Sequence, residues 1–202
     1  MDNHFYINLD VRPDRNKETI RELKKIGIRE PNRMSAVRHK IGLVGCAMSH
    51  IKVLQKAKEL GWDYCMVFED DILIDDGYEL KEKINKYLHY DYDVLYLGCW
   101  NVEPPDMINE DLMRVRHAWT THAYIVKCHY YDTLIENLKE GCIQKMKYPD
   151  NNIYNIDEYI SILQQKDKWL CFNPIMVTQR DGWSDNFNSV RNLSQIIKSI
   201  PN

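Results

Sequence analysis

The residues best suited to chemistry are three consecutive carboxylates, Glu69-Asp70-Asp71, which directly follow the apolar run at 64–68. Alternate residues of an extended chain point to the same side, so Glu69 and Asp71 can share one face. Two carboxylates placed this way repel each other unless a cation lies between them. Mg²⁺ or Mn²⁺ would remove the repulsion and could also bind the oxygens of a substrate diphosphate. On spacing alone a solvated acidic turn is the alternative, because two more aspartates follow at 75–76.

A second carboxylate pair, Asp157-Glu158, stands at the start of a helical pattern and can supply a general base. Such a base takes the proton of an acceptor hydroxyl as that hydroxyl attacks. Asn155 has the position of an N-cap, and Glu158 follows three residues later, which is the spacing of a capping box. This structural role for Glu158 favours Asp157 as the base. The amino end of a helix lowers a carboxyl pKa, however, whereas a base benefits from a raised one.

Strand-like and helix-like segments alternate along the chain. The carboxyl ends of the strands are expected to position the carboxylates described above. Apolar strand-like runs lie at 5–9, 64–68, 93–98, 123–127 and 169–172, and helical periodicity lies at 13–26, 45–60, 78–90, 131–141 and 156–163. Gly27 and Gly141 are expected to end two of the helices. The order predicts one α/β domain over residues 1–202, with a mostly parallel central sheet flanked by helices. Ligands of such sheets bind beyond the carboxyl ends of the strands.

Composition narrows the class of protein. The chain has 202 residues, 44% of them apolar and 28% charged, with a net charge of −3, so a nucleic-acid partner is not expected. No signal peptide or transmembrane segment is apparent, which predicts a cytoplasmic protein. The six cysteines form no C-x-x-C pair and are expected to be reduced thiols. No pattern indicates an oligomeric state.

Six segments, in order along nearly the whole chain, resemble glycosyltransferase family 25, which includes bacterial lipooligosaccharide galactosyltransferases and procollagen galactosyltransferases. The segments are Tyr6–Asp10 with Arg12–Arg15, Gly42–His50, Phe68–Asp71, Thr121–Ile125, Ile156–Tyr159, and Gln179 with Ser184-Asp185. The resemblance implies a GT-A fold, a UDP-linked sugar donor, a divalent metal and inversion at the anomeric carbon.

The resemblance also implies site residues, most of them in these segments, with Ala36 and Val37 beside the nucleobase. Arg12 and Arg15 are near enough to the first strand to reach phosphate, which arginine binds with a planar fork. The full set expected at the donor is Ile7, Asn8, Leu9, Arg12, Arg15, Ala36, Val37, Ser49 and Asp70, and the set expected at the metal is Glu69, Asp71 and Asp185. Asp185 can instead cap a turn. His50 shares a helical face with apolar residues, so it is either a structural histidine or a support for the donor site.

The predicted function is transfer of a hexose, galactose or glucose, from a UDP-sugar, with Mn²⁺ or Mg²⁺ as cofactor. The acceptor would be a hydroxyl on a glycan or on a glycosylated protein of the hydroxylysine type. One alternative is a catalytically inactive nucleotide-sugar-binding module on the same fold. Another is a Mg²⁺-dependent nucleotidyltransferase, although no Gly-rich phosphate loop follows the first strand.

Overall fold

The structure is a computed structural model that describes residues 1–184 and 189–191. Five α-helices are present in this part of the chain: α1 (Pro13–Lys25), α2 (Gly42–Glu59), α3 (Gly77–Tyr87), α4 (Tyr131–Lys147) and α5 (Ile156–Lys166). Two short 3₁₀ helices lie at Cys128–Tyr130 and Asn152–Tyr154. None of the helices within these limits has the length and apolar character needed to span a bilayer. All six cysteines are free, as expected.

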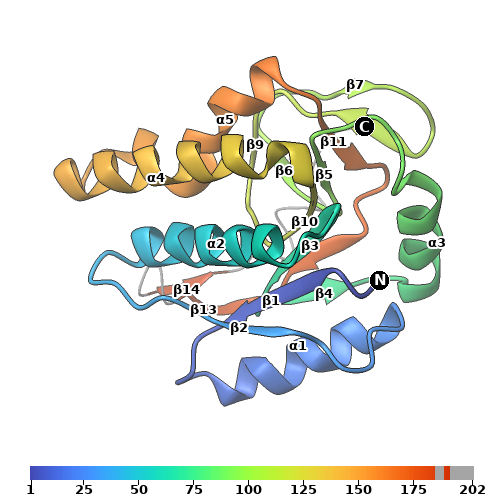
Figure 1. The fold of residues 1–202 in the computed structure, drawn as a ribbon, viewed down its shortest axis with the longest axis horizontal. Helices are drawn as coiled ribbons and strands as arrows, with labels where there is room; N and C mark the ends of the chain where they lie inside the picture. The colour runs from blue at the N-terminus through green and yellow to red at the C-terminus, as the bar shows by residue number, and fades with distance from the viewer. Residues whose placement is uncertain (185–188, 192–202) are drawn as a thin grey trace.

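A central sheet of eight strands runs through the described residues (Figure 1). Its spatial order is β2 (Arg33–Ser35), β1 (His4–Asn8), β3 (Tyr64–Glu69), β10 (Ala123–Lys127), β5 (Val94–Tyr96), β11 (Trp169–Phe172), β8 (Leu112–Arg114) and β7 (Asp106–Met107). Only β10 and β8 run against the direction that the other six share. The α/β class and the mostly parallel sheet are therefore confirmed.

The described residues also form three two-stranded ladders, which sequence periodicity did not predict. They pair β4 (Ile72–Ile74) with β12 (Val177–Gln179), β13 (Gly182–Ser184) with β14 (Ser189–Arg191), and β6 (Trp100–Asn101) with β9 (Ala118–Trp119). Each strand has only two or three residues, which is too short for a period of two to be recognised. The first ladder matters for the site, because it pairs Gln179 with Ile72 at the start of β4, next to the acidic residues.

The central strand β3 is buried on both faces, as its continuous apolar run predicts. Cys65 and Val67 pack into the core shared with α2, α4 and α5, while Met66 and Phe68 pack into the core shared with α1 and α3. Figure 1 shows α2, α4 and α5 gathered on one side of the sheet and α1 on the other. Glu69 ends β3 and is only half-buried after four buried residues, so the strand delivers a carboxylate to the sheet edge.

The expectation that a helix ends near Gly141 is wrong, because α4 continues to Lys147. A Cβ on Gly141 would lie 3.0 Å from Cδ1 of Tyr159 on α5. The glycine therefore permits close packing of α4 on α5. Gly27, with a φ of 88°, does follow the end of α1 as expected.

Gly98 allows β12 to approach the central sheet closely beside the site. A Cβ at this position would lie 1.8 Å from the carbonyl oxygen of Val177 in β12, and that oxygen also contacts His122 Nε2 at 3.0 Å. Gly98→Ala should displace β12 and lower the free energy of unfolding by about 1–3 kcal/mol, the usual cost of overpacking. Urea denaturation followed by circular dichroism measures this change. An unchanged midpoint would show that β12 does not depend on this close approach.

Candidate active site

An open cleft of about 260 Å³ lies at the carboxyl ends of β1 and β3. This is the edge of the sheet at which ligands were expected. Most of the expected donor-site residues line it, together with two of the three expected metal ligands. They are Ile7, Asn8, Leu9, Arg15, Ala36, Val37, Ser49 and Asp70, with Glu69 and Asp71.

The cleft wall also contains residues that sequence reasoning did not assign to the donor site: Val11, Arg38, His39, Gly42, Cys46 and Ser184. A signal for two of them was present in the basic run at 38–40, which stands just before α2. The amino end of a helix attracts anions, and basic residues placed there strengthen that attraction. Gly42, Cys46 and Ser184 lie in segments that carry the family resemblance, whereas no pattern in the sequence marks Val11.

Arg12 is placed differently from the other expected donor-site residues. Its guanidinium pairs with Asp14 at 2.8 Å, and it is not among the described residues that line the cleft. Its carbonyl oxygen accepts a hydrogen bond from Asn8 Nδ2 at 3.1 Å. The residue thus helps to fix the turn after β1, and its contact with a donor stays a prediction.

Both carboxylate oxygens of Asp70 are bound by protein groups. Asn8 Nδ2 donates to Oδ2 at 2.7 Å, and Arg15 Nη1 donates to Oδ1 at 2.8 Å. The hydroxyl of Thr19 donates to the Asp70 carbonyl oxygen at 3.0 Å. Asp70 therefore ties β1 and α1 to the end of β3.

Glu69 contacts groups from α2 and from the segment before β10. Its Oε1 accepts a hydrogen bond from the Thr121 hydroxyl at 2.7 Å and lies 3.3 Å from His50 Nε2. His50 is 1% exposed, and its Nδ1 lies 3.0 Å from the Tyr124 hydroxyl. His50 is thus a buried structural histidine that also supports the site.

Asp71 contacts residues at the end of β12. Gln179 Nε2 lies 3.3 Å from one of its carboxylate oxygens, and Arg15 Nη1 lies 3.8 Å away. Its carbonyl oxygen accepts the backbone N–H of Arg180 at 2.7 Å. The β4–β12 ladder therefore positions this carboxylate.

The electrostatics of the cluster show an excess of negative charge. Burial, together with the charges of Glu69 and Asp70, raises the pKa of Asp71 to about 7. Burial also raises the pKa of Asp70, although Arg15 opposes the shift. Burial acts in the same sense on Glu69, but hydrogen bonds from His50 and Thr121 outweigh it and lower the Glu69 pKa. One guanidinium does not balance three carboxylates at close range.

Asp157 is the second residue of α5 and is held by backbone N–H groups. Glu158 N donates to Asp157 Oδ1 at 3.0 Å, and the backbone of Thr120 also donates to this carboxylate. Thr120 has a φ of 77°, which β-branched residues rarely adopt. The next residue, Thr121, binds Glu69, so two consecutive residues connect Asp157 with the acidic cluster.

The pKa of Asp157 is raised. Burial is the cause, and the hydrogen bonds from the backbone at the helix start offset it only in part. The lowering effect of the helix start, which the sequence predicted, is therefore present, but burial, for which the sequence had no signal, has the larger effect on the pKa. A raised pKa suits a general base.

The expected capping box at Asn155 and Glu158 does not form. Asn155 is the N-cap residue of α5, but its side chain makes no capping hydrogen bond, and its Oδ1 is buried without a hydrogen-bond partner. Glu158 Oε2 instead accepts a hydrogen bond from Trp119 Nε1 at 2.6 Å and lies 3.2 Å from His117 Nε2. These two aromatic residues lie some forty positions earlier in the chain, so a local motif could not reveal the contact.

Asp185, expected as a metal ligand or a turn cap, lies outside the described residues. Its neighbour Ser184 lines the cleft, and the carbonyl oxygen of Trp183 accepts a hydrogen bond from Arg15 Nη2. The Trp183 side chain is 45% exposed.

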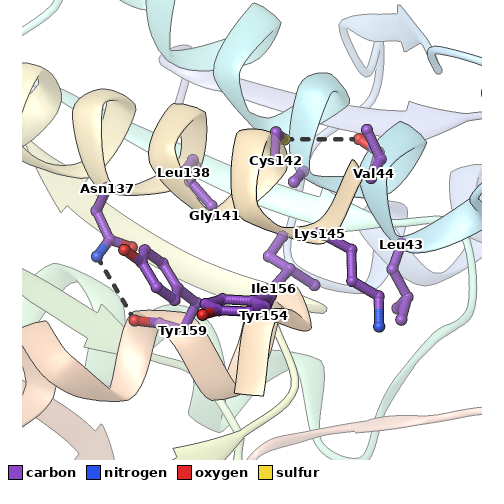
Figure 2. A pocket seen from close by; sticks show the side chains of 11 residues that line it. Leu43, Val44, Asn137, Leu138, Gly141, Cys142, Lys145, Tyr154, Ile156 and Tyr159 are labelled. Atoms are coloured by element: carbon purple, nitrogen blue, oxygen red, sulfur yellow. Dashed lines mark hydrogen bonds between the residues drawn. The ribbon is translucent and has the colours of Figure 1, made fainter. Parts of the chain in front are cut away.

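A second hollow lies between α2, α4 and α5 (Figure 2). Its wall includes Leu138, Gly141 and Tyr159, which border the gap between the helices. The space is about 10 Å³, which is enough for about one water molecule. This hollow is a packing gap, and the cleft at β1 and β3 remains the candidate site.

Comparisons with known proteins show the family and the fold of the chain. The curated lipooligosaccharide biosynthesis protein lex-1 of Haemophilus influenzae is 23% identical over 157 residues, which cover 68% of this chain and 51% of that protein. The chain thus spans about half the length of this curated relative. The crystal structure of a glycosyltransferase involved in the glycosylation of the major capsid of PBCV-1 matches with a TM-score of 0.54 at 10% identity, over 85% of this chain and 81% of that chain.

The structural match confirms the expected GT-A-type fold. The family model described as "Glycosyltransferase family 25 (LPS biosynthesis protein)" matches residues 32–158, a range that contains both the acidic cluster and the Asp157-Glu158 pair. With more than half of its length matched, the chain belongs to glycosyltransferase family 25.

Proposed function

We propose that this chain is a metal-dependent, inverting glycosyltransferase that moves galactose or glucose from a UDP-linked donor to a saccharide hydroxyl. The observation that carries the proposal is the acidic cluster at 69–71, which ends a buried strand inside an open cleft. Asp157, the candidate base, is connected to the cluster through the backbone at 120–121.

The donor would lie along the end of β1. Ile7, Leu9 and Val37 offer apolar wall beside which a nucleobase can pack, and Ala36 adjoins them. Ser49 acts through the backbone, because its hydroxyl accepts the N–H of Val37 at 2.8 Å and donates to a carbonyl oxygen of α2. Arg15 is well placed to attract the diphosphate, since guanidinium groups bind phosphate oxygens with two N–H groups.

The donor set fits a hard divalent cation. Asp70 is already bound by Asn8 and Arg15, so Glu69 and Asp71 are the carboxylates that would hold Mn²⁺ or Mg²⁺. The raised pKa of Asp71 marks the negative charge that such an ion would balance. When bound, the ion would stabilise the charge that develops on the departing UDP.

Asp157 would accept the proton of the acceptor hydroxyl. As the hydroxyl oxygen forms its bond to the anomeric carbon, the bond from that carbon to the β-phosphate oxygen breaks and UDP leaves with the electron pair. Attack from the face opposite the phosphate inverts the anomeric carbon. Glu158 would orient Trp119 and His117 beside the acceptor.

A saccharide of the lipopolysaccharide type is the acceptor that we propose. The support is the family description and the lipooligosaccharide role in the printed name of the curated relative. A collagen-type hydroxylysine acceptor, which the sequence resemblance also implied, has no such support.

Turnover of a donor panel tests the function. The protein, incubated with Mn²⁺ and UDP-galactose, UDP-glucose or other UDP-sugars, should release UDP with one hexose donor well above the rest. EDTA should abolish the release, because no ion would then stabilise the charge that develops on the departing UDP. Binding of UDP without turnover of any donor would favour the inactive binding module, and pyrophosphate release from a nucleoside triphosphate would favour a nucleotidyltransferase.

The Asp157-Glu158 pair can be separated by matched variants. Asp157→Asn should lower kcat by about 100-fold or more, the usual contribution of a general base. Glu158→Gln keeps a hydrogen-bonding group for Trp119 and should change mainly KM for the acceptor. Initial rates with a saturating donor measure both effects. Near-normal turnover in Asp157→Asn with loss in Glu158→Gln would reverse the assignment.

The raised pKa of Asp71 predicts a pH-dependent gain in stability for Asp71→Asn in metal-free protein. Because the folded-state pKa of about 7 exceeds the unfolded value of about 3.9, the stability from protonation of Asp71 is complete below about pH 4 and is lost as pH rises through about 7. At pH 8 only the wild type carries the unfavourable charge, so the variant should have the higher Tm. At pH 5 the difference should be smaller.

Thermal denaturation in EDTA at pH 5 and pH 8 measures this difference. Asp75→Asn is the matched control, since Asp75 is an exposed aspartate near the same strand. The account of the cluster charge fails if Asp71→Asn shows the same Tm difference at both pH values.

A further inference from the structure

A sulfur, a nitrogen and an oxygen ligand converge at one point on the α2 side of the cleft. Cys46 and His50 are four residues apart on α2 and therefore share a face, and Glu69 ends β3 opposite them. The Cys46 sulfur, a ring nitrogen of His50 and a Glu69 carboxylate oxygen all lie within 4.8 Å of one another. Among the described residues, no other three His, Cys, Asp or Glu side chains bring their ligand atoms this close together. Asp71 is not part of this group.

The histidine of this group is held in one orientation by its neighbours. It is 1% exposed, and its Nδ1 lies 3.0 Å from the Tyr124 hydroxyl while its Nε2 faces Glu69 at 3.3 Å. The ring of Tyr124 also stacks on the imidazole with centroids 5.7 Å apart. Metal-binding histidines are commonly fixed in this way, with the second ring nitrogen held by a hydrogen-bonding partner.

We propose that Cys46, His50 and Glu69 form a site for a borderline or soft divalent cation, with Zn²⁺ as its natural occupant. The reason is the donor set: thiolate and imidazole select such ions, whereas Mg²⁺ and Mn²⁺ prefer oxygen ligands alone. All three residues line the cleft, so a fourth coordination position would face solvent. Three protein ligands with one open position is a common arrangement for zinc.

Metal binding requires only small movements of the three side chains. Tetrahedral zinc bonds of about 2.0–2.3 Å place the ligand atoms roughly 3.3–3.8 Å apart, so displacements of the ligand atoms by about an ångström close the site. The Cys46 thiol releases its proton to solvent as the sulfur–metal bond forms. With the ion bound, the imidazole stays neutral with its one proton on Nδ1, so Nε2 is free to bind the ion while Nδ1–H donates a hydrogen bond to the Tyr124 oxygen.

The site is distinct from the Glu69/Asp71 pair proposed above, although the two share Glu69. The Glu69 carboxylate already faces His50 at 3.3 Å, and a cation held from α2 would keep it there. Ions at the two positions would therefore compete, and zinc would oppose any activity that depends on Mn²⁺.

Cobalt is the probe for the site, because Co²⁺ replaces Zn²⁺ and its bond to a thiolate absorbs in the near ultraviolet. Metal-free wild-type protein titrated with Co²⁺ should develop this absorption at a ratio of one ion per chain. Zn²⁺ should remove the signal by displacement. Cys46→Ser should lose it, and His50→Gln should weaken Co²⁺ binding by about 10-fold or more. Cys128→Ser, which removes an exposed thiol, should keep the full signal.

A second measurement uses the unaltered chain in case a variant fails to fold. Zn²⁺ should protect Cys46 from alkylation, mapped by peptide mass spectrometry, while the exposed Cys128 reacts equally with and without Zn²⁺. The proposal is overturned if folded wild-type protein gives no thiolate signal, if Cys46→Ser keeps it, or if Zn²⁺ leaves the alkylation of Cys46 unchanged. Neither readout uses a nucleotide-sugar, so failure here is separate from failure of the proposed transferase activity.

Discussion

The structure depends on holding three adjacent carboxylates at the end of a buried strand. Burial and mutual repulsion both disfavour that arrangement, and the surrounding groups respond to it. Arg15 pairs with the charge of Asp70, and Asn8 donates a hydrogen bond to the same carboxylate. His50 and Thr121 donate hydrogen bonds to Glu69. Much of the local architecture can be understood as partial compensation for this charge, and the raised pKa of Asp71 shows that compensation is incomplete.

The compensating groups come from widely separated parts of the chain, so the site and the fold form together. The first strand and helix supply Asn8 and Arg15, and the helix α2 supplies His50. The late strand β12 supplies Gln179 through its ladder with β4. The strained backbone of Thr120 then links the cluster to the start of α5. Strain at such a position is retained where the surroundings require it, as at functional sites.

Features that depend on a local pattern of residues could be predicted from the sequence, whereas features that depend on contacts between distant segments could not. The burial of β3 and the position of residues 69–71 at the sheet edge followed from one apolar run and three carboxylates. The role of Gly141 did not, because its close contact with Tyr159 involves another helix. The capping box at Glu158 failed for the same reason, since Trp119 offers a partner that local spacing cannot show. Short ladders such as β4–β12 carry too few residues for any period to be read.

The central claim is that Glu69 and Asp71 hold a divalent ion that in turn holds the nucleotide diphosphate. Calorimetric titration of UDP into the protein, with Mn²⁺ and with EDTA, tests it most directly. The account predicts that Mn²⁺ strengthens UDP binding at least about 10-fold in the wild type, equivalent to about 1.4 kcal/mol, and that Asp71→Asn removes this dependence. Equal affinity in Mn²⁺ and in EDTA, or an undiminished Mn²⁺ effect in Asp71→Asn, would contradict it.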